Sequence, residues 1–186
     1  DMPEISSQWA WGAYGINRDN VESLVIGNNV TGIGDYAFAG MTGLTRVVIP
    51  NGVTNIGDYA FQGCAGLSRV TIRCDGVSMS SVFDGCVSIR ELFLDMPTVP
   101  RDFGSAFFKR CWYNYETGEF EIPPNDFTVS TNAVTVIFGD TTTTIEDNAF
   151  YNCVGLANLV FGSGTVNIND WGFQYCVGLT NIVFGS

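Results

Sequence analysis

The segment IGDYAFQGCAGLSRVTI, residues 56–72, recurs three more times along this chain with small changes. The copies read IGDYAFAGMTGLTRVVI at residues 33–49, IEDNAFYNCVGLANLVF at residues 145–161 and INDWGFQYCVGLTNIVF at residues 168–184. Each copy places an Asp, a Phe, a Cys or Met, and a Leu at the same spacing. The chain is therefore built from copies of one unit.

The spacing of the units indicates the architecture. The Phe that marks each unit falls at Phe38, Phe61, Phe83, Phe107 or Phe108, Phe150 and Phe173. The steps between these residues are 22 to about 24 residues long, except for one step of about 42. Periods of roughly 20 to 29 residues are typical of leucine-rich solenoids. The period predicts a stack of about six coils, one of which carries an insertion.

Each unit contains a strand signal. Three apolar residues recur with the spacing L-x-x-V-x-I, and the last two alternate with one intervening residue, as in a strand with one buried face. Because each coil returns to the same side, we expect neighbouring strands to run parallel. A second short extended piece is expected at residues 30–33, 53–56 and 165–168. The trios are Leu44, Val47, Ile49; Leu67, Val70, Ile72; Ile89, Leu92, Leu94; Leu156, Leu159, Phe161; and Leu179, Ile182, Phe184.

The repeated Asp suggests how each coil turns its corner. Asp35, Asp58, Asp147 and Asp170 each stand two residues before Ala-Phe or Gly-Phe. An Asp side chain can cap the free amide groups at the start of a helical turn. We therefore expect a short helical turn at each corner, with the Phe and Cys side chains directed into the stack.

These signals predict an α/β solenoid with parallel strands on one face and short helical turns at the corners. We expect a right-handed leucine-rich-repeat superhelix of about six units, with one inserted β-hairpin. All 186 residues are assigned to a single domain. We expect an N-terminal cap at residues 1–23, rich in Trp and Tyr, repeats at 24–108, the insertion at 109–133, and further repeats at 134–186.

Composition excludes several classes of partner. The formal net charge is −11, and Lys109 is the only lysine. Such a chain repels phosphate backbones, so nucleic acids and anionic membranes are poor partners. No apolar run approaches the roughly 18 residues that a membrane span requires. Because residue 1 is Asp and not Met, the numbering begins either after a removed leader or inside a longer chain. We expect the first, and with it an extracellular or cell-surface location.

Five of the six cysteines occupy one repeat position, where the first unit carries Met41. Since an apolar Met replaces Cys there, we interpret the position as a packing site of buried thiols. Stacked neighbours would be near enough for disulfides, so bridging stays open. Cys74 lies outside the register and is predicted to be a surface thiol. The five are Cys64, Cys86, Cys111, Cys153 and Cys176.

The sequence gives no support for catalysis, a metal or a cofactor. The chain has no His, which excludes Ser-His-Asp and Cys-His catalysis and the commonest zinc sites. The repeated Asp residues do not lie in a dense calcium-binding loop. No phosphate-binding glycine motif lies between a strand and a helix. We therefore expect a non-enzymatic protein without a cofactor.

Two regions are candidates for binding. On the outward side of the strands, one column of mostly apolar residues is predicted, and it includes Phe93, Ile137 and Val160. This column is either ordinary strand composition or a stripe that a partner covers. Beside it runs a second column in which Arg46 and Arg69 could anchor a carboxylate, although Glu91 would neutralise Arg69.

The second candidate region is the insertion. The segment CWYNYETGEFEIPP, residues 111–124, is typical of a hairpin that turns at residues 116–118. Its aromatic residues either bind a partner or cover a local gap in the core. The candidate contacts are Trp112, Tyr113, Tyr115 and Phe120.

The segment VVIPNGVTNIGDYAFQGCAGLSRVTI, residues 47–72, resembles the BspA-like leucine-rich repeats of bacterial surface and secreted proteins. The resemblance is close at residues 24–72 and 136–184 and weaker at 73–135, where SMSSVFDGC lacks the I-G-x-x-A pattern. It implies an exported, non-enzymatic protein that adheres to a protein partner, such as a host or matrix protein. Two alternatives remain: a structural spacer or assembly module, and an enzyme or carbohydrate binder that uses acidic and aromatic side chains around Trp112 and Glu116.

Overall fold

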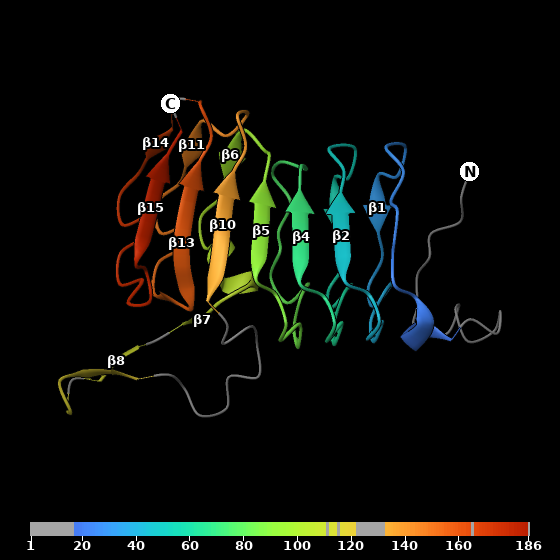
Figure 1. The fold of residues 1–186 in the computed structure, drawn as a ribbon, viewed down its shortest axis with the longest axis horizontal. Helices are drawn as coiled ribbons and strands as arrows, with labels where there is room; N and C mark the ends of the chain where they lie inside the picture. Colours follow the sequence, from blue (N-terminus) through green and yellow to red (C-terminus); the bar gives the residue numbers. More distant parts are fainter. Residues whose placement is uncertain (1–16, 111, 115, 122–132, 165, 186) are drawn as a thin grey trace.

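The computed structural model describes residues 17–110, 112–114, 116–121, 133–164 and 166–185; for residues 109, 110, 112–114 and 119–121 it describes the backbone only. Most of the cap that we predicted at residues 1–23, with its Trp and Tyr residues, lies outside these ranges. Within them, the chain winds as a solenoid whose strands lie side by side (Figure 1).

A six-stranded parallel sheet forms one side of the stack. Each strand pairs with the strand of the next coil, so the sheet grows by one strand per repeat (Figure 1). The predicted parallel stack of about six coils is confirmed. The strands in spatial order are β15 (Asn181–Phe184), β13 (Leu156–Phe161), β10 (Val134–Phe138), β5 (Glu91–Leu94), β4 (Arg69–Ile72) and β2 (Arg46–Ile49).

Shorter parallel strands lie on the opposite side of the coils. They form two separate sheets, because the coil between them contributes no strand over residues 73–90, all of which the structure describes. This is the coil whose sequence lacks the I-G-x-x-A pattern. One sheet pairs β1 (Gly32–Ile33) with β3 (Asn55–Ile56), and the other contains β6 (Thr98–Val99), β11 (Thr144–Ile145) and β14 (Asn167–Ile168).

The core lies between the two sides and consists of stacked columns of like side chains. The rings of Phe38, Phe61, Phe83 and Phe107 follow one another at centroid distances of 5.1, 5.3 and 4.9 Å. Of the two candidates that the sequence left open, Phe107 and not Phe108 supplies the fourth ring of this column. A coil cannot bury these rings alone, and it does so only against its neighbours.

In the last described coil, which has a described neighbour on one side, the inward side chains are only partly buried. Ile182 and Phe184 occupy inward positions, yet they are 50% and 70% exposed. Phe184 stacks on Phe161 at 4.9 Å through one face only. The equivalent inward residues in the middle of the stack are fully buried because both faces are covered.

The corners that carry the repeated Asp are series of turns, and the predicted short helices do not form there. In the described residues, helix is limited to two 3₁₀ segments, η1 (Arg18–Asn20) and η2 (Phe103–Ala106). The residue after each repeated Asp lies in the left-handed region, as at Tyr36 with φ of 55° and Trp171 with φ of 59°. An α-helix cannot continue through that conformation.

Hydrogen bonds between coils explain this difference. The Tyr36 and Phe38 amides donate to the carbonyl groups of Asp58 and Ala60 in the next coil, at 3.0 and 2.7 Å. The Asp35 carboxylate likewise accepts from the Asp58 amide at 2.9 Å, so it bridges two coils and does not cap its own turn. The corner amides thus find partners in the neighbouring coil in place of the carbonyl groups of a helix.

The insertion leaves the stack at a corner. Its first strand, β7 (Lys109–Arg110), pairs antiparallel with β12 (Cys153–Val154). Beyond it, β8 (Trp112–Asn114) and β9 (Glu119–Glu121) pair antiparallel on either side of a turn at residues 116–118. This hairpin lies beyond the lower ends of the sheet strands (Figure 1), while β5 and β10 pair directly with each other.

Among the described residues, no helix is long and apolar enough to cross a membrane.

Candidate interaction surface

The outward side of the six-stranded sheet carries two parallel columns of side chains. Strand pairing places Val48, Thr71, Phe93, Ile137, Val160 and Val183 side by side, and we call this set the apolar column. All six side chains are partly or largely exposed. Five of the six are apolar residues on a face that no other described element covers, which is unusual for a surface that meets only water.

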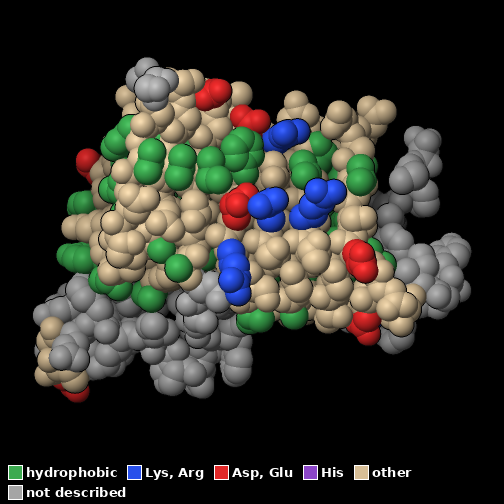
Figure 2. Space-filling model, in the orientation of Figure 1, with side chains coloured by type: hydrophobic (Ala, Val, Ile, Leu, Met, Phe, Trp, Pro, Cys, Tyr) green, Lys and Arg blue, Asp and Glu red, His purple; other side chains and the backbone are tan. Residues whose placement is uncertain are grey.

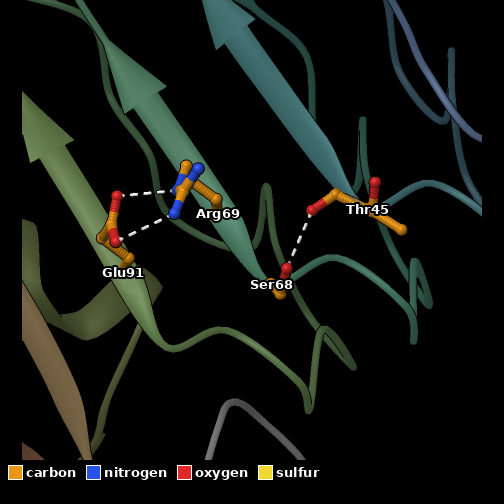
Figure 3. A network of polar contacts seen from close by, with 4 residues as sticks. All are labelled: Thr45, Ser68, Arg69 and Glu91. Carbon is orange, nitrogen blue, oxygen red and sulfur yellow. Dashed lines mark hydrogen bonds and ion pairs between the residues drawn. The ribbon is translucent and has the colours of Figure 1, made fainter.

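The second column is polar and changes character along the sheet. We call Arg46, Arg69, Glu91, Thr135, Asn158 and Asn181 the polar column. Arg69 and Glu91 face each other on β4 and β5, with 2.7 Å between Nε and Oε1 and 3.3 Å between Nη2 and Oε2 (Figure 3). On the other half of the sheet, Asn158 Nδ2 donates to Thr135 Oγ1 at 3.1 Å.

The hydroxyl groups at the start of the strands have a structural role. Ser68 Oγ donates to the Thr45 carbonyl at 3.1 Å (Figure 3), and Thr45 Oγ1 donates to the Glu22 carbonyl at 3.3 Å. These bonds give an additional partner to carbonyl groups where the strands begin. They tie adjacent coils together.

Two further arginines belong to this face, and the sequence interpretation missed them. Arg73 follows β4 directly and lies 3.6 Å from Asp95 between Nε and Oδ2. Arg90 precedes β5 and is exposed. Each lies one residue outside the repeated strand segment. Neither therefore belongs to the columns that were predicted from the strand positions. Figure 2 shows the basic side chains gathered over β2, β4 and β5, beside a row of hydrophobic side chains.

The structure brings one group of the predicted contact residues together. Arg46, Arg69, Phe93, Ile137 and Val160 share the outward face of one sheet. The other group belongs to the insertion. Trp112, Tyr113 and Phe120 lie in the strands of the hairpin, but their side chains are outside the described part of the structure, as is the whole of Tyr115.

Four of the repeat cysteines are buried free thiols, as their interpretation as packing residues predicts: Cys64, Cys86, Cys153 and Cys176. Cys111 lies outside the described residues. A hydrogen bond with the Cys64 sulfur, together with burial, raises the pKa of the Cys86 thiol. The Cys64 and Cys86 sulfurs also lie 3.2 and 3.1 Å from the carbonyl oxygens of Phe38 and Phe61.

The prediction that Cys74 is a surface thiol is wrong. Its side chain is only 1% exposed, because the chain after β4 turns inward and packs Cys74, Val77 and Met79 into the core. Burial raises the pKa of the Cys74 thiol to about 11. This cysteine therefore behaves as a small apolar side chain, like those of the repeat position.

One cavity of about 350 Å³ lies away from the sheet face, at the coil that lacks a second strand. It is lined by residues 76–80, 100–103 and 105. Its one basic side chain, Arg101, already pairs with Asp147 at 3.0 Å, so the cavity offers no free positive charge to a ligand. Among the described residues, no cluster of three or more His, Cys, Asp or Glu side chains is placed to hold a metal ion.

Comparison with known proteins agrees with this geometry. The model of the BspA type leucine rich repeat region, with six copies, matches residues 12–121 and 120–186. None of the curated proteins matches the chain.

Three solved structures are similar to this chain. A leucine-rich repeat protein from Eubacterium ventriosum is 23% identical, with a TM-score of 0.48, over 84% of this chain and 37% of that protein. One from Bacteroides ovatus is 20% identical, with a TM-score of 0.37, over 89% and 43%. A leucine rich cell surface protein from Faecalibacterium prausnitzii is 19% identical, with a TM-score of 0.29, over 85% and 59%. The chain thus spans 37% to 59% of the length of these proteins.

Proposed function

Because the chain belongs to the BspA type leucine-rich repeat family, we propose that it is a non-catalytic module that binds another protein through the outward face of its six-stranded sheet. The proposed location is the cell surface or the extracellular space, where a host or matrix protein is the expected partner. The aromatic insertion serves as a second contact. Repeat proteins commonly present an extended surface of this kind to their partners.

The observation that carries this proposal is the apolar column. Its six members run across all six strands, and the spacing of strands in a sheet makes the column about 24 Å long. Burying such a row against a partner removes apolar surface from water, which favours association. The backbone of the sheet fixes the column, so little ordering is needed when a partner binds.

The experiment compares three forms of the whole chain. The chain, Ile137→Glu and Asn167→Glu are each immobilised and exposed to matrix and mucosal protein extracts, and the captured proteins are identified by mass spectrometry. Ile137 lies in the middle of the apolar column, whereas Asn167 is exposed on β14 on the opposite side of the coils. We expect Ile137→Glu to lose the specific capture and Asn167→Glu to keep it. Equal capture by all three forms would exclude the sheet face.

The insertion is tested separately. Replacing residues 112–121 by a short Gly-Ser linker removes β8 and β9 without touching a strand of the main sheet. If the hairpin is a second contact, the shortened chain binds the same partner more weakly but still responds to Ile137→Glu. Undiminished binding would restrict the contact to the sheet.

The same apolar column would also suit a second copy of the chain, as an assembly module requires. Sedimentation analysis over a range of concentrations separates the two functions. A dimer that Ile137→Glu dissociates supports assembly, and a monomer at all concentrations supports a different protein as the partner.

A further inference from the structure

The sheet face has a charge that the rest of the molecule does not share. Arg46, Arg69, Arg73 and Arg90 lie on or beside β2, β4 and β5, and they are half of the eight basic residues in the chain. We call these four residues the arginine patch. With Glu91 and Asp95, which pair with two of them, the patch has a formal charge of 4 − 2 = +2, so the remaining residues carry −11 − 2 = −13.

Ion pairs within the described part of the chain neutralise only some of this positive charge. Strand pairing sets Arg46 directly beside Arg69, and like charges at such positions are unfavourable. Glu91 neutralises Arg69, but neither Arg46 nor Arg90 forms an ion pair with any residue that the structure describes. Glu22 lies beside Thr45, one strand from Arg46, but it forms no ion pair with Arg46. Stability of the sheet therefore does not account for Arg46 or Arg90.

We propose that the arginine patch binds an acidic segment of the partner, and that apolar side chains of the same segment rest on Val48, Phe93 and Ile137. This inference deepens the proposed function and rests on it. It assigns the two kinds of side chain of the segment to the two columns: its acidic residues lie over the arginines of β2, β4 and β5, and its apolar residues lie over the apolar column beside them.

The sheet itself shows how a carboxylate fits this face. Glu91 reaches from β5 to Arg69 on β4 and meets two of its guanidinium nitrogens (Figure 3). An exposed Arg46 on the neighbouring strand presents the same guanidinium fork with no carboxylate from the described residues in front of it. A Glu or Asp side chain of the partner supplies that group, and paired contacts of this kind are stronger than a single charge contact.

The apolar column decides between two kinds of acidic partner. A sulfated glycan presents anions and hydroxyl groups, and it would leave Phe93 and Ile137 in contact with polar groups. A protein segment in which acidic and apolar residues alternate can satisfy both columns, because they run side by side along the same strands. The arrangement therefore favours an acidic protein segment.

The test uses fluorescence anisotropy with the whole chain and labelled synthetic probes. The first probe is a short peptide in which Glu alternates with Leu, the second replaces Glu by Gln, the third replaces Leu by Ser, and the fourth is heparin. We expect the Glu-Leu peptide to bind more tightly than the other three probes. Its affinity should fall as salt is added, because salt screens the charge contacts. Tighter binding of heparin, equal binding of the Gln-Leu peptide, or no binding of the Glu-Leu peptide would overturn the inference.

Variants locate the binding. Arg46→Gln and Arg90→Gln should each raise the dissociation constant of the Glu-Leu peptide about fivefold. This is the size of effect expected for the loss of one exposed charge contact. Arg101→Gln is the matched control, since Arg101 is also exposed but pairs with Asp147 away from the sheet. Equal effects of all three variants would show that only net charge matters and would contradict the inference.

The two proposals fail in different ways. If Ile137→Glu abolishes partner capture while Arg46→Gln and Arg90→Gln leave it unchanged, the sheet face is the binding surface but the partner is not acidic there. If none of the three variants changes capture, the sheet face itself is excluded.

Discussion

The two halves of the main sheet are alike on the inside and different on the outside. In the half formed by β2, β4 and β5, and in the half formed by β10, β13 and β15, the inward positions hold Val, Ile, Leu or Phe. On the outward side, the first half carries four arginines at or beside its strands, whereas the second half carries Thr135, Asn158 and Asn181. The same scaffold therefore supports two surface chemistries.

This difference follows from what each position contacts. An inward side chain packs against its counterparts in the coils before and after it, so a change must suit two neighbours at once. An outward side chain meets solvent and one layer of neighbours, and it can vary with little effect on stability. The inward columns thus specify the fold, and the outward columns are free to specify a partner.

The largest expected effect tests whether the two halves have equivalent cores. Phe61 and Phe150 are both fully buried, and each stacks on the Phe of an adjacent coil. Phe61→Ala and Phe150→Ala should each lower the free energy of unfolding by about 3–5 kcal/mol, measured by urea denaturation. Val25→Ala, at a position 90% exposed, is the control and should change little. If only one of the two variants lost little stability, the half that contains it would not fold together with the other half.

A smaller effect is confined to the first half, where Cys74 is buried. Its thiol has a pKa of about 11 in the folded chain, above the ordinary value of 9.0, because burial disfavours the thiolate. The neutral thiol therefore contributes stability that is complete below pH 9 and is lost as the pH rises toward 11. We expect this loss to be about 2–3 kcal/mol.

The measurement compares denaturation curves between pH 8 and 11 for the chain and for Cys74→Val, which has no titrating thiol. The variant should lose less stability across that range. Identical pH profiles would mean that the Cys74 thiol reaches solvent in the folded chain.

The smallest expected effects differ in sign between the halves. Arg46→Thr removes a like-charge neighbour of Arg69 and should raise stability by about 0.2–1 kcal/mol. Asn158→Ala removes the hydrogen bond to Thr135 and should lower stability by about 0.5–1.5 kcal/mol. Precise thermal unfolding at low salt can separate these changes. If Arg46→Thr were destabilising, Arg46 would have a structural role, and its value as a sign of a partner would disappear.

The repeat made much of this structure predictable. Aligning the copies was enough to place Arg46 beside Arg69 and Ile137 beside Phe93, because one strand per coil fixes the register. The corners were not predictable in the same way. Asp35 has the sequence context of a helix cap, but its carboxylate bonds to the amide of the next coil, and such bonds exist only once the coils are stacked.

Residues outside the repeat were harder to place. Cys74 follows a strand in the coil with the weakest pattern, so no other copy showed that it points inward. Arg73 and Arg90 stand one residue beyond a strand, where alternation no longer tells which way a side chain points. The aromatic contacts expected in the insertion remain a prediction.

The direct pairing of β5 with β10 has a consequence for how such chains diversify. About forty residues separate these strands in sequence, yet they are hydrogen-bonded neighbours, and the segment between them includes a hairpin outside the main sheet. Doubling the length of a flexible loop costs only about 0.6 kcal/mol in closure entropy. The corner after β7 is thus a tolerant grafting point, where evolution or a protein engineer can exchange one appendage for another while the stacked coils remain unchanged.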